Sequence, residues 1–421
     1  MSERVKRRRL NDTTDNVDSD GSCRPDSGNE KSSWNGFCEL ESEPALFNVM
    51  LREFGVTGVK VQEVVSLDDE FLACLNKPVY GLIFLFRWRE DDPDKQEASC
   101  PDGLWFANQT AGNACASVAL LNIVNNIEGI DLGENLRSFK DFTMPFTPAL
   151  RGDAISNFEF VKRIHNSFAR QMDILNSDLH LKHEATSKRN RSKKRGRDEG
   201  EADAGFHFIA FVPALGKVWK FDGLERQPQA LGAFGPDSDW LDLVKPNIRA
   251  NMEEYEEDQI EFSILSLARD PLPDLVEKLA LNIKQLEAIE RAIASHGRDE
   301  GDVANVGPRA IEPLPENTLL GPDKSYGVTE NDLRQISMSP EREQGYLRCT
   351  MDELAQHREE QSRAQIELRA TVREEQQSQQ ADDDYAAGRR YDYGPAIRTW
   401  LRFLARKQII EGLIPKAEGT R

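Results

Sequence analysis

A cysteine begins the apolar part of "LWFANQTAGNACASVALLNIV", residues 104–124. The residues just before Cys115 are polar, which is uncommon ahead of a core helix. The thiolate is the reactive form of cysteine, and the unpaired N–H groups at a helix N-terminus favour an anion. Cys115 is therefore a candidate nucleophile. The alternative is a small buried hydrophobe, the commoner role of a lone cysteine in an apolar helix.

A cysteine nucleophile needs a base, and the chain has six histidines. His207 lies in the apolar strand pattern "GFHFIAF", where a buried imidazole requires a polar partner. Asp222 closes the next strand pattern, "KVWKFDG", just before a glycine. In an antiparallel pair these two side chains lie side by side, so the carboxylate can orient the imidazole. Taken singly, a core histidine and a turn aspartate are the alternatives.

Gln109 precedes Cys115 by six residues. Its side-chain amide and the backbone N–H of Cys115 are candidate donors to a developing oxyanion. The other histidines fit the chemistry less well. His180 and His183 lie in a polar stretch, and two ligands there do not predict a metal site.

Composition excludes several classes of protein. The net charge of −19 argues against general nucleic-acid binding by the 421-residue chain. No apolar run is long enough to span a membrane, and no apolar stretch follows the basic N-terminus to make a secretory signal. The six cysteines are scattered, which indicates a reducing compartment rather than a disulfide framework.

The elements that must position these residues lie between positions 34 and 270. Residues 1–33 are polar and are expected to be a disordered tail. A helix is expected in "PALFNVMLREFG", and strands in "VKVQEVVSL", "VYGLIFLFRW", "FHFIAFVPALGKVWKFDG" and "IEFSILSLARD". The second of these strands is apolar throughout and is expected to be central and covered on both faces. The polar stretch 169–204 is expected to be a long loop.

Beyond residue 270 the pattern becomes helical. A heptad-like seam in "PDLVEKLALNIKQLEAIERAIA" predicts a packed helix within an extension over 271–380. Residues 296–342 are expected to be a linker because they are rich in Gly, Pro, Asn and Asp. A charged, solvated helix begins at Met351. Residues 381–421 are expected to hold a partner-docking helix with Ile397, Trp400, Leu401 and Leu404 on one face. Folding back onto the core is the alternative.

"QTAGNACAS" resembles the active-site motif of the ubiquitin C-terminal hydrolase peptidases, which have the papain-like plan. "FHFIAFVPALGKVWKFDGL" is similar to their His and Asp strands, "WNGFCELESEPALFNVMLREFGV" to their opening segment, and "HNSFAR" to the start of their crossover loop. Gly112 stands where the motif has an asparagine. The C-terminal "YDYGPAIRTWLRFLARKQIIEGLI" resembles the extension of the long members, which work on the proteasome or in a polycomb deubiquitinase complex.

The resemblance implies an α/β fold of the α+β, papain-like type: a central antiparallel sheet flanked by helices, followed by an α-helical extension. It implies a cysteine deubiquitinase with Cys115 as nucleophile, His207 as general base and acid, Asp222 as its orienter and Gln109 in the oxyanion hole. No cofactor or metal is implied. A ubiquitin-binding scaffold with little activity is the alternative function.

The resemblance also implies partners. Ubiquitin and its conjugates are the expected substrates. A proteasome ubiquitin-receptor subunit or a polycomb-type regulator is expected to bind residues 391–416. Basic runs at 6–9 and 188–197 are either solvated charge or import signals, and the expected location is cytoplasm and nucleus.

Overall fold

In the computed structural model of the chain, the described residues are 34–88, 91–170, 173–174, 205–235, 238–253, 262–299 and 313–407. The chain divides into two compact units, Met1–Asn35 and Gly36–Arg421, and the second contains every described strand and helix. The expected tail over 1–33, both basic runs, nearly all of the expected loop and the last residues of the docking segment lie outside the described residues.

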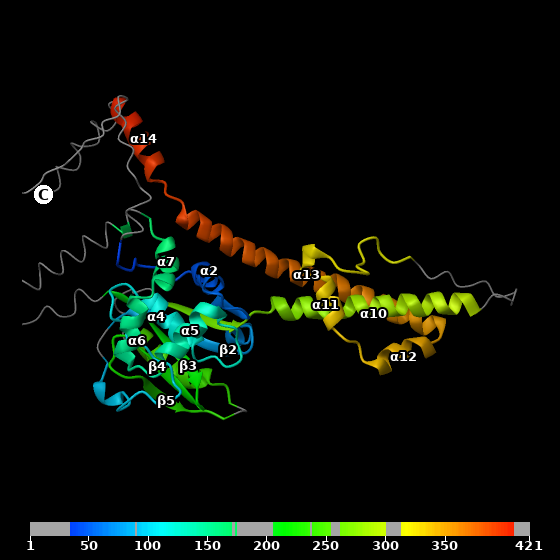
Figure 1. Cartoon of the computed structure of the whole chain (residues 1–421), viewed down its shortest axis with the longest axis horizontal. Coiled ribbons are helices and arrows are strands. Elements are labelled where there is room, and N and C mark those ends of the chain that lie inside the picture. Colours follow the sequence, from blue (N-terminus) through cyan, green and yellow to red (C-terminus); the bar gives the residue numbers. More distant parts are fainter. Residues whose placement is uncertain are drawn as a thin grey trace, which may run out of the picture. The chain divides into compact units, whose positions relative to one another are not determined.

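Six strands form one antiparallel sheet in the order β1-β6-β2-β3-β4-β5, of which Figure 1 labels β2 to β5. They are β1 (Val59–Glu63), β2 (Val79–Arg87), β3 (Phe206–Ala214), β4 (Lys217–Phe221), β5 (Gln229–Ala233) and β6 (Ser263–Arg269). The expected strands are confirmed, including the hairpin that turns at Leu215 and Gly216. β2 pairs with β3 and β6 and is mostly buried, which explains its continuous apolar sequence.

Helix α4 (Cys115–Val124) packs on β2 and β3 (Figure 1). Every residue after Cys115 in this helix is buried, as its all-round apolar sequence requires. The close approach depends on Gly81 in β2, because a Cβ there would lie 2.6 Å from a side-chain carbon of Ile123. The sheet therefore fixes the position of the helix that carries Cys115.

Further helices complete the sheet domain, residues 36–270. An apolar cluster that includes Phe84, Ile209 and Val244 joins the sheet to α9 (Leu241–Glu253). The expected helix α2 (Pro44–Phe54) is confirmed and ends at Gly55. The remaining described helices of this domain are α3 (Asp69–Leu72), η1 (Pro93–Lys95), α5 (Gly133–Thr143), α6 (Pro148–Ser156) and α7 (Glu159–Ser167).

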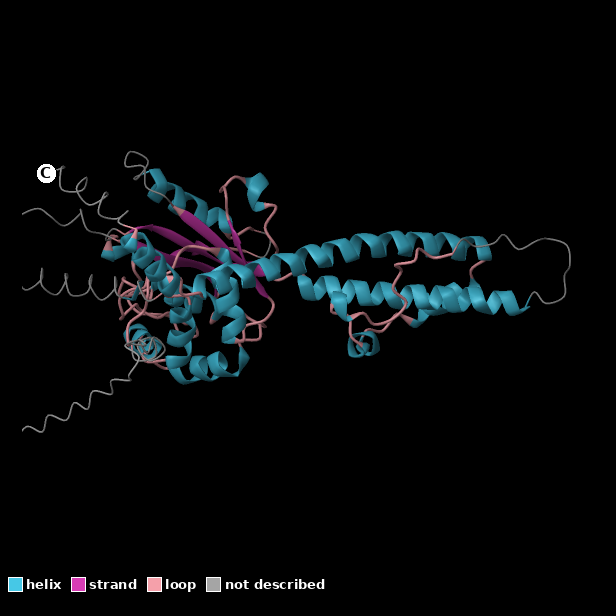
Figure 2. Cartoon of the chain, turned by 90° about the horizontal axis from the view of Figure 1, so that it is seen from above, coloured by secondary structure: helices cyan, strands magenta, loops and turns pink. Residues whose placement is uncertain are grey.

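The extension is built on two long helices that pack side by side, α10 (Leu272–Asp299) and α13 (Met351–Arg390) (Figures 1 and 2). Leu279 and Ile283 of α10 share an apolar cluster with Val372 of α13. Between the helices, the buried Gln365 amide donates to Asn282 Oδ1 at 3.0 Å. The expected packed helix is confirmed. None of the described helices is long and apolar enough to cross a membrane.

The expected linker over 296–342 requires correction. Helix α10 runs on to Asp299, and residues 324–348 hold η3 (Lys324–Tyr326), α11 (Glu330–Gln335) and α12 (Pro340–Arg348). Tyr326 and Val328 are buried in the cluster between α10 and α13. The polar residues here are turn and cap residues, since Thr329 and Asp332 form a capping box. Residues 300–312 lie outside the described residues.

The expected division at residue 380 also requires correction, because α13 continues to Arg390. Its last turns are held by the sheet domain: Asp382 accepts from the Asn48 amide at 3.0 Å, and Arg390 donates to Glu53 at 2.8 Å. These contacts stabilise the last turns of α13, where the sequence has few apolar residues. A separate helix, α14 (Gly394–Arg406), follows.

Candidate active site

Cys115 is the first residue of α4 and is partly exposed, unlike the rest of that helix. Asn113, two residues earlier, has a φ of 59°, a left-handed conformation that Asn tolerates better than most residues. No side chain caps the helix at Ala114. The first N–H groups therefore remain available to stabilise negative charge beside the thiol.

The segment before Cys115 is held by side chains from both sides. On one side, the Asn122 side-chain amide accepts from the N–H of Ala107 at 2.8 Å and donates to the Ala107 carbonyl oxygen at 3.2 Å. The Asn126 side-chain amide likewise accepts from the N–H of Trp105 and donates to the Trp105 carbonyl oxygen. Asn122 lies in the last turn of α4 and Asn126 in the turn that directly follows the helix, four residues later, so both face the segment. Each asparagine thus pairs with both the N–H and the carbonyl oxygen of one residue, as a neighbouring strand would.

On the other side, the buried Arg151 guanidinium donates to the carbonyl oxygens of Leu104 and Phe106, each at 3.1 Å. Successive carbonyl groups of an extended chain point to opposite sides. Arg151 therefore binds the carbonyl oxygens that point away from the two asparagines. The backbone that leads to Gln109 and Cys115 is thus fixed without belonging to the sheet.

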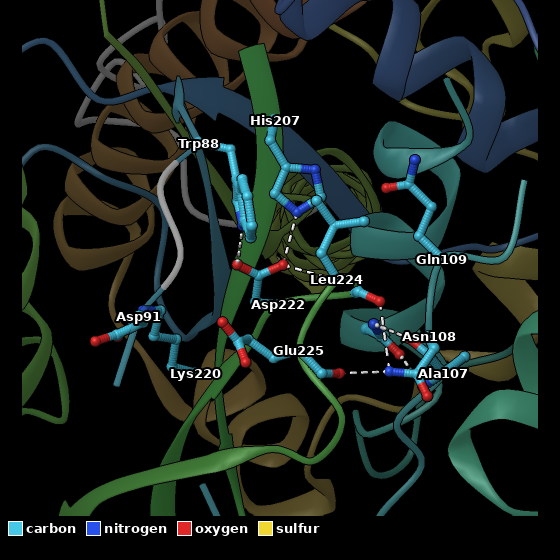
Figure 3. A network of polar contacts seen from close by, with 12 residues as sticks. Trp88, Asp91, Ala107, Asn108, Gln109, His207, Lys220, Asp222, Leu224 and Glu225 are labelled. Carbon is cyan, nitrogen blue, oxygen red and sulfur yellow. Dashed lines mark hydrogen bonds and ion pairs between the residues drawn. The ribbon is translucent and has the colours of Figure 1, made fainter. Parts of the chain in front are cut away.

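His207 and Asp222 meet as expected from the hairpin. His207 is the second residue of β3, Asp222 directly follows β4, and His207 Nε2 lies 2.7 Å from Asp222 Oδ1 (Figure 3). Both side chains are almost fully buried. This contact leaves the other ring nitrogen, Nδ1, open, and hydrogen bonding and charge from the Cys115 side chain act on the His207 imidazole.

The electrostatics of this pair favour a charged imidazole. Burial alone would lower the pKa of His207, but hydrogen bonds and charge from Asp222 and Cys115 outweigh it and raise that pKa to about 9. Burial alone would raise the pKa of the Asp222 carboxyl, but the hydrogen bond and charge of His207 outweigh it and lower that pKa overall. An imidazolium between a thiol and a carboxylate is suited to proton transfer.

Gln109 is joined to the same turn. Its backbone N–H donates to the carbonyl oxygen of Gly223 at 2.8 Å, and its Nε2 donates to Ala111 O at 3.1 Å. The second hydrogen of Nε2 is left for another acceptor. The four predicted residues are thus tied together: the Gly223 contact links Gln109 to Asp222, and His207 links Asp222 to Cys115.

The chain matches the family model described as "Ubiquitin carboxyl-terminal hydrolase, family 1" over residues 37–253. The chain belongs to this family. It is therefore a deubiquitinating hydrolase, a cysteine peptidase that acts at the carboxyl terminus of ubiquitin. The match covers the described strands β1 to β5 and both residues of the His207–Asp222 pair.

Relatives of this hydrolase are similar over different lengths. "Ubiquitin carboxyl-terminal hydrolase isozyme L5" of Dictyostelium discoideum is 33% identical over 76% of this chain and 86% of its own length. "Ubiquitin carboxyl-terminal hydrolase BAP1" of Xenopus tropicalis is 34% identical over 50% of this chain and 30% of its own length. A solved structure, Trichinella spiralis UCH37 bound to ubiquitin vinyl methyl ester, is 28% identical over 64% of this chain and 91% of that chain, with a TM-score of 0.44.

The other described histidines of the hydrolase lie elsewhere. His165 on α7 is fully buried between Ser117 Oγ and the carbonyl oxygen of Cys38, each at 2.8 Å, and burial lowers its pKa to about 4. His296 and His357 belong to the helical extension. His180 and His183 lie outside the described residues. Within the described ranges, no group of three or more His, Cys, Asp or Glu side chains is arranged to hold a metal ion.

Besides Arg151 and the two asparagines, sequence reasoning missed Trp88, Gly223 and Asn108, which support the site. Trp88 donates its indole N–H to Asp222 Oδ2 at 3.2 Å. Gly223 allows Gln109 to approach, since a Cβ there would lie 3.1 Å from the Gln109 backbone nitrogen. The Asn108 amide donates to Glu225 O at 2.6 Å. The Asp-Gly sequence could have indicated a special backbone position at Gly223. The contacts of Trp88 and Asn108 depend on tertiary structure and leave no signal in the sequence.

Proposed function

We propose that the hydrolase cleaves the bond after the C-terminal glycine of ubiquitin with Cys115 as nucleophile, His207 as general acid and base, Asp222 as its orienter and Gln109 as oxyanion donor. The observation that carries this proposal is the position of His207, whose Nε2 lies 2.7 Å from Asp222 Oδ1 and whose pKa is raised by both Asp222 and Cys115.

In the first half of the reaction, Cys115 Sγ attacks the carbonyl carbon of the terminal glycine. The carbonyl oxygen becomes an oxyanion, which the Gln109 Nε2–H and the Cys115 backbone N–H stabilise. When the tetrahedral intermediate collapses, the C–N bond breaks and the His207 imidazolium gives its proton to the departing amine. A thioester between Cys115 and ubiquitin remains.

In the second half, neutral His207 takes a proton from water, and the resulting hydroxide attacks the thioester carbonyl. The same two donors stabilise the second oxyanion. Collapse breaks the C–S bond, releases ubiquitin with a free carboxylate and restores the thiolate–imidazolium pair. Asp222 holds the imidazole in one orientation and stabilises its charged form in both halves.

The test is hydrolysis of a fluorogenic amide at the ubiquitin C-terminus by full-length variants. His207→Gln should abolish turnover, and Asp222→Asn should lower kcat by about 10⁴-fold while ubiquitin binding is kept. His296→Gln, in the extension, is the matched control and should keep the wild-type kcat. Wild-type turnover by His207→Gln would refute the assignment.

We also propose that α14 docks on a partner. Ile397, Trp400, Leu401 and Phe403 are each about half exposed or more on this helix, so the described residues do not cover its apolar side. Arg398, Arg402 and Arg406 recur at i, i+4 and i+8 on another side. An apolar stripe of this kind suits a groove on another protein. From the family resemblance, the partner is a proteasome ubiquitin-receptor subunit or a polycomb-type regulator, and the location is cytoplasm and nucleus.

Co-purification of the full-length chain with each candidate partner tests this docking. A double variant, Trp400→Ser with Leu401→Ser, should lose the partner and keep its own hydrolysis of a ubiquitin ester. Arg402→Ser, which changes the exposed basic side of the same helix, is the matched control and should retain most of the binding. Undiminished binding by the double variant would exclude α14 as the docking element.

A further inference from the structure

Sheet register places Trp88 on the same face as the catalytic pair. Phe86 lies opposite His207 in the β2–β3 pairing, and the pairing extends one step beyond β2, since Trp88 N–H donates to Gly205 O at 3.2 Å. Side chains two residues apart on a strand share a face. Trp88 is therefore a diagonal neighbour of His207, within reach of a long aromatic side chain.

The Asp222 carboxylate receives donors on both oxygens. Oδ1 accepts from His207 Nε2 at 2.7 Å and from the Leu224 backbone N–H at 2.9 Å. Oδ2 accepts from Trp88 Nε1 at 3.2 Å. Figure 3 shows the indole and the imidazole converging on this one carboxylate from adjacent strands.

Donors on both oxygens restrict rotation about the Cβ–Cγ bond of Asp222. With Oδ2 held by Trp88, Oδ1 is kept in line with His207 Nε2, and the imidazole keeps one orientation toward Cys115. Trp88 also packs against the apolar cluster that contains Phe84 and Phe86. Packing alone would be satisfied by any ring of similar size, but the N–H directed at the carboxylate is particular to tryptophan.

We propose that Trp88 is a positioning residue for the hydrolase reaction, acting through Asp222 by fixing the plane of its carboxylate. The proposal rests on the proposed roles of His207 and Asp222. It assigns Trp88 no contact with ubiquitin, so its loss should change the chemical step and leave substrate affinity unchanged.

The test uses Trp88→Phe in the full-length chain, which keeps an aromatic ring and removes the N–H. With a fluorogenic ubiquitin amide, kcat should fall about 10-fold, as expected for loss of one hydrogen bond to a charged group, and KM should be unchanged. Trp240→Phe is the matched control: its indole also donates at 3.2 Å, but to the Val79 carbonyl oxygen in the core. That variant should keep the wild-type kcat.

A double-mutant cycle with Asp222→Ala shows whether Trp88 acts through the carboxylate. In the Asp222→Ala background, adding Trp88→Phe should leave the residual kcat unchanged. If Trp88→Phe slows that background by the same factor as wild type, or raises KM with kcat intact, the positioning role is overturned. If Asp222→Ala itself turns over at the wild-type rate, the triad assignment fails instead.

Discussion

Gly223→Ala should slow the hydrolase by displacing Gln109. An added Cβ would lie 3.1 Å from both the Cβ and the backbone nitrogen of Gln109, and 3.3 Å from Val118 Cγ1. Because ordinary carbon contacts are about 3.5–4.0 Å, Gln109 must retreat by a few tenths of an ångström. Its 2.8 Å hydrogen bond to the Gly223 carbonyl oxygen weakens at the same time. A displacement of about 1 Å costs about 10²-fold in rate, so we expect kcat to fall about 10-fold.

The assay is steady-state hydrolysis of a fluorogenic ubiquitin amide, with thermal unfolding of the same preparations. Gly345→Ala, where an added Cβ meets nothing within 4 Å, is the matched control. In the Gln109→Ala background, Gly223→Ala should have no further effect on kcat, because the amide it displaces is already absent. A folded Gly223→Ala variant with wild-type kcat would refute this reasoning, and an undiminished loss in the Gln109→Ala background would show that the methyl acts through Asp222.

Three further perturbations probe Gln109 and the two buried histidines. Gln109→Ala should lower kcat by about 10²-fold with little change in KM, the usual loss for one oxyanion donor; an equal loss of ubiquitin affinity would make Gln109 a binding residue. Because the raised pKa of His207 is about 9, kcat/KM should stay constant up to about pH 9 and fall above it as the imidazolium is lost. Asp222→Asn should move this fall to lower pH. The same pH profile in Asp222→Asn and wild type would contradict the pairing of His207 with Asp222. The buried His165 has its pKa lowered from 6.5 to about 4, so the unfolded chain binds its proton first, and the free energy of unfolding should decrease by about 3 kcal/mol as pH falls from about 6.5 to about 4. Urea unfolding of His165→Gln should lack this component, and equal pH slopes in the two proteins would contradict it.

The parts of the fold that sequence patterns predict correctly are those whose burial is visible locally. The apolar run of β2 predicts a central strand because both of its faces are covered. β5 has the sequence QALGA, with no fully buried and no β-branched residue, so its pattern does not separate it from a loop. The segment around Tyr326 has the pattern of a linker because its polar cap residues separate the side chains that pack in the cluster of α10 and α13, so those side chains show no helical or strand period.

The same distinction applies to the site. Cys115, His207 and Asp222 each lie at the end of an element that hydrophobic patterning reveals, so their convergence follows from one helix and one hairpin. Trp88 contacts Asp222 because of strand register, and Arg151 of α6 contacts the irregular segment that leads to Gln109. Neither contact leaves a periodic signal, and a single sequence does not predict it.

The most direct test of the central claim is covalent capture by ubiquitin carrying an electrophile at its C-terminus, followed by mass spectrometry of the modified peptide. The full-length protein should form a one-to-one adduct on Cys115. Cys74→Ala should be captured like wild type, although Cys74 is the more exposed thiol, and Cys115→Ala should form no adduct. Capture of Cys115→Ala at the wild-type rate, or an adduct on another cysteine, would contradict the assignment of Cys115 as the nucleophile.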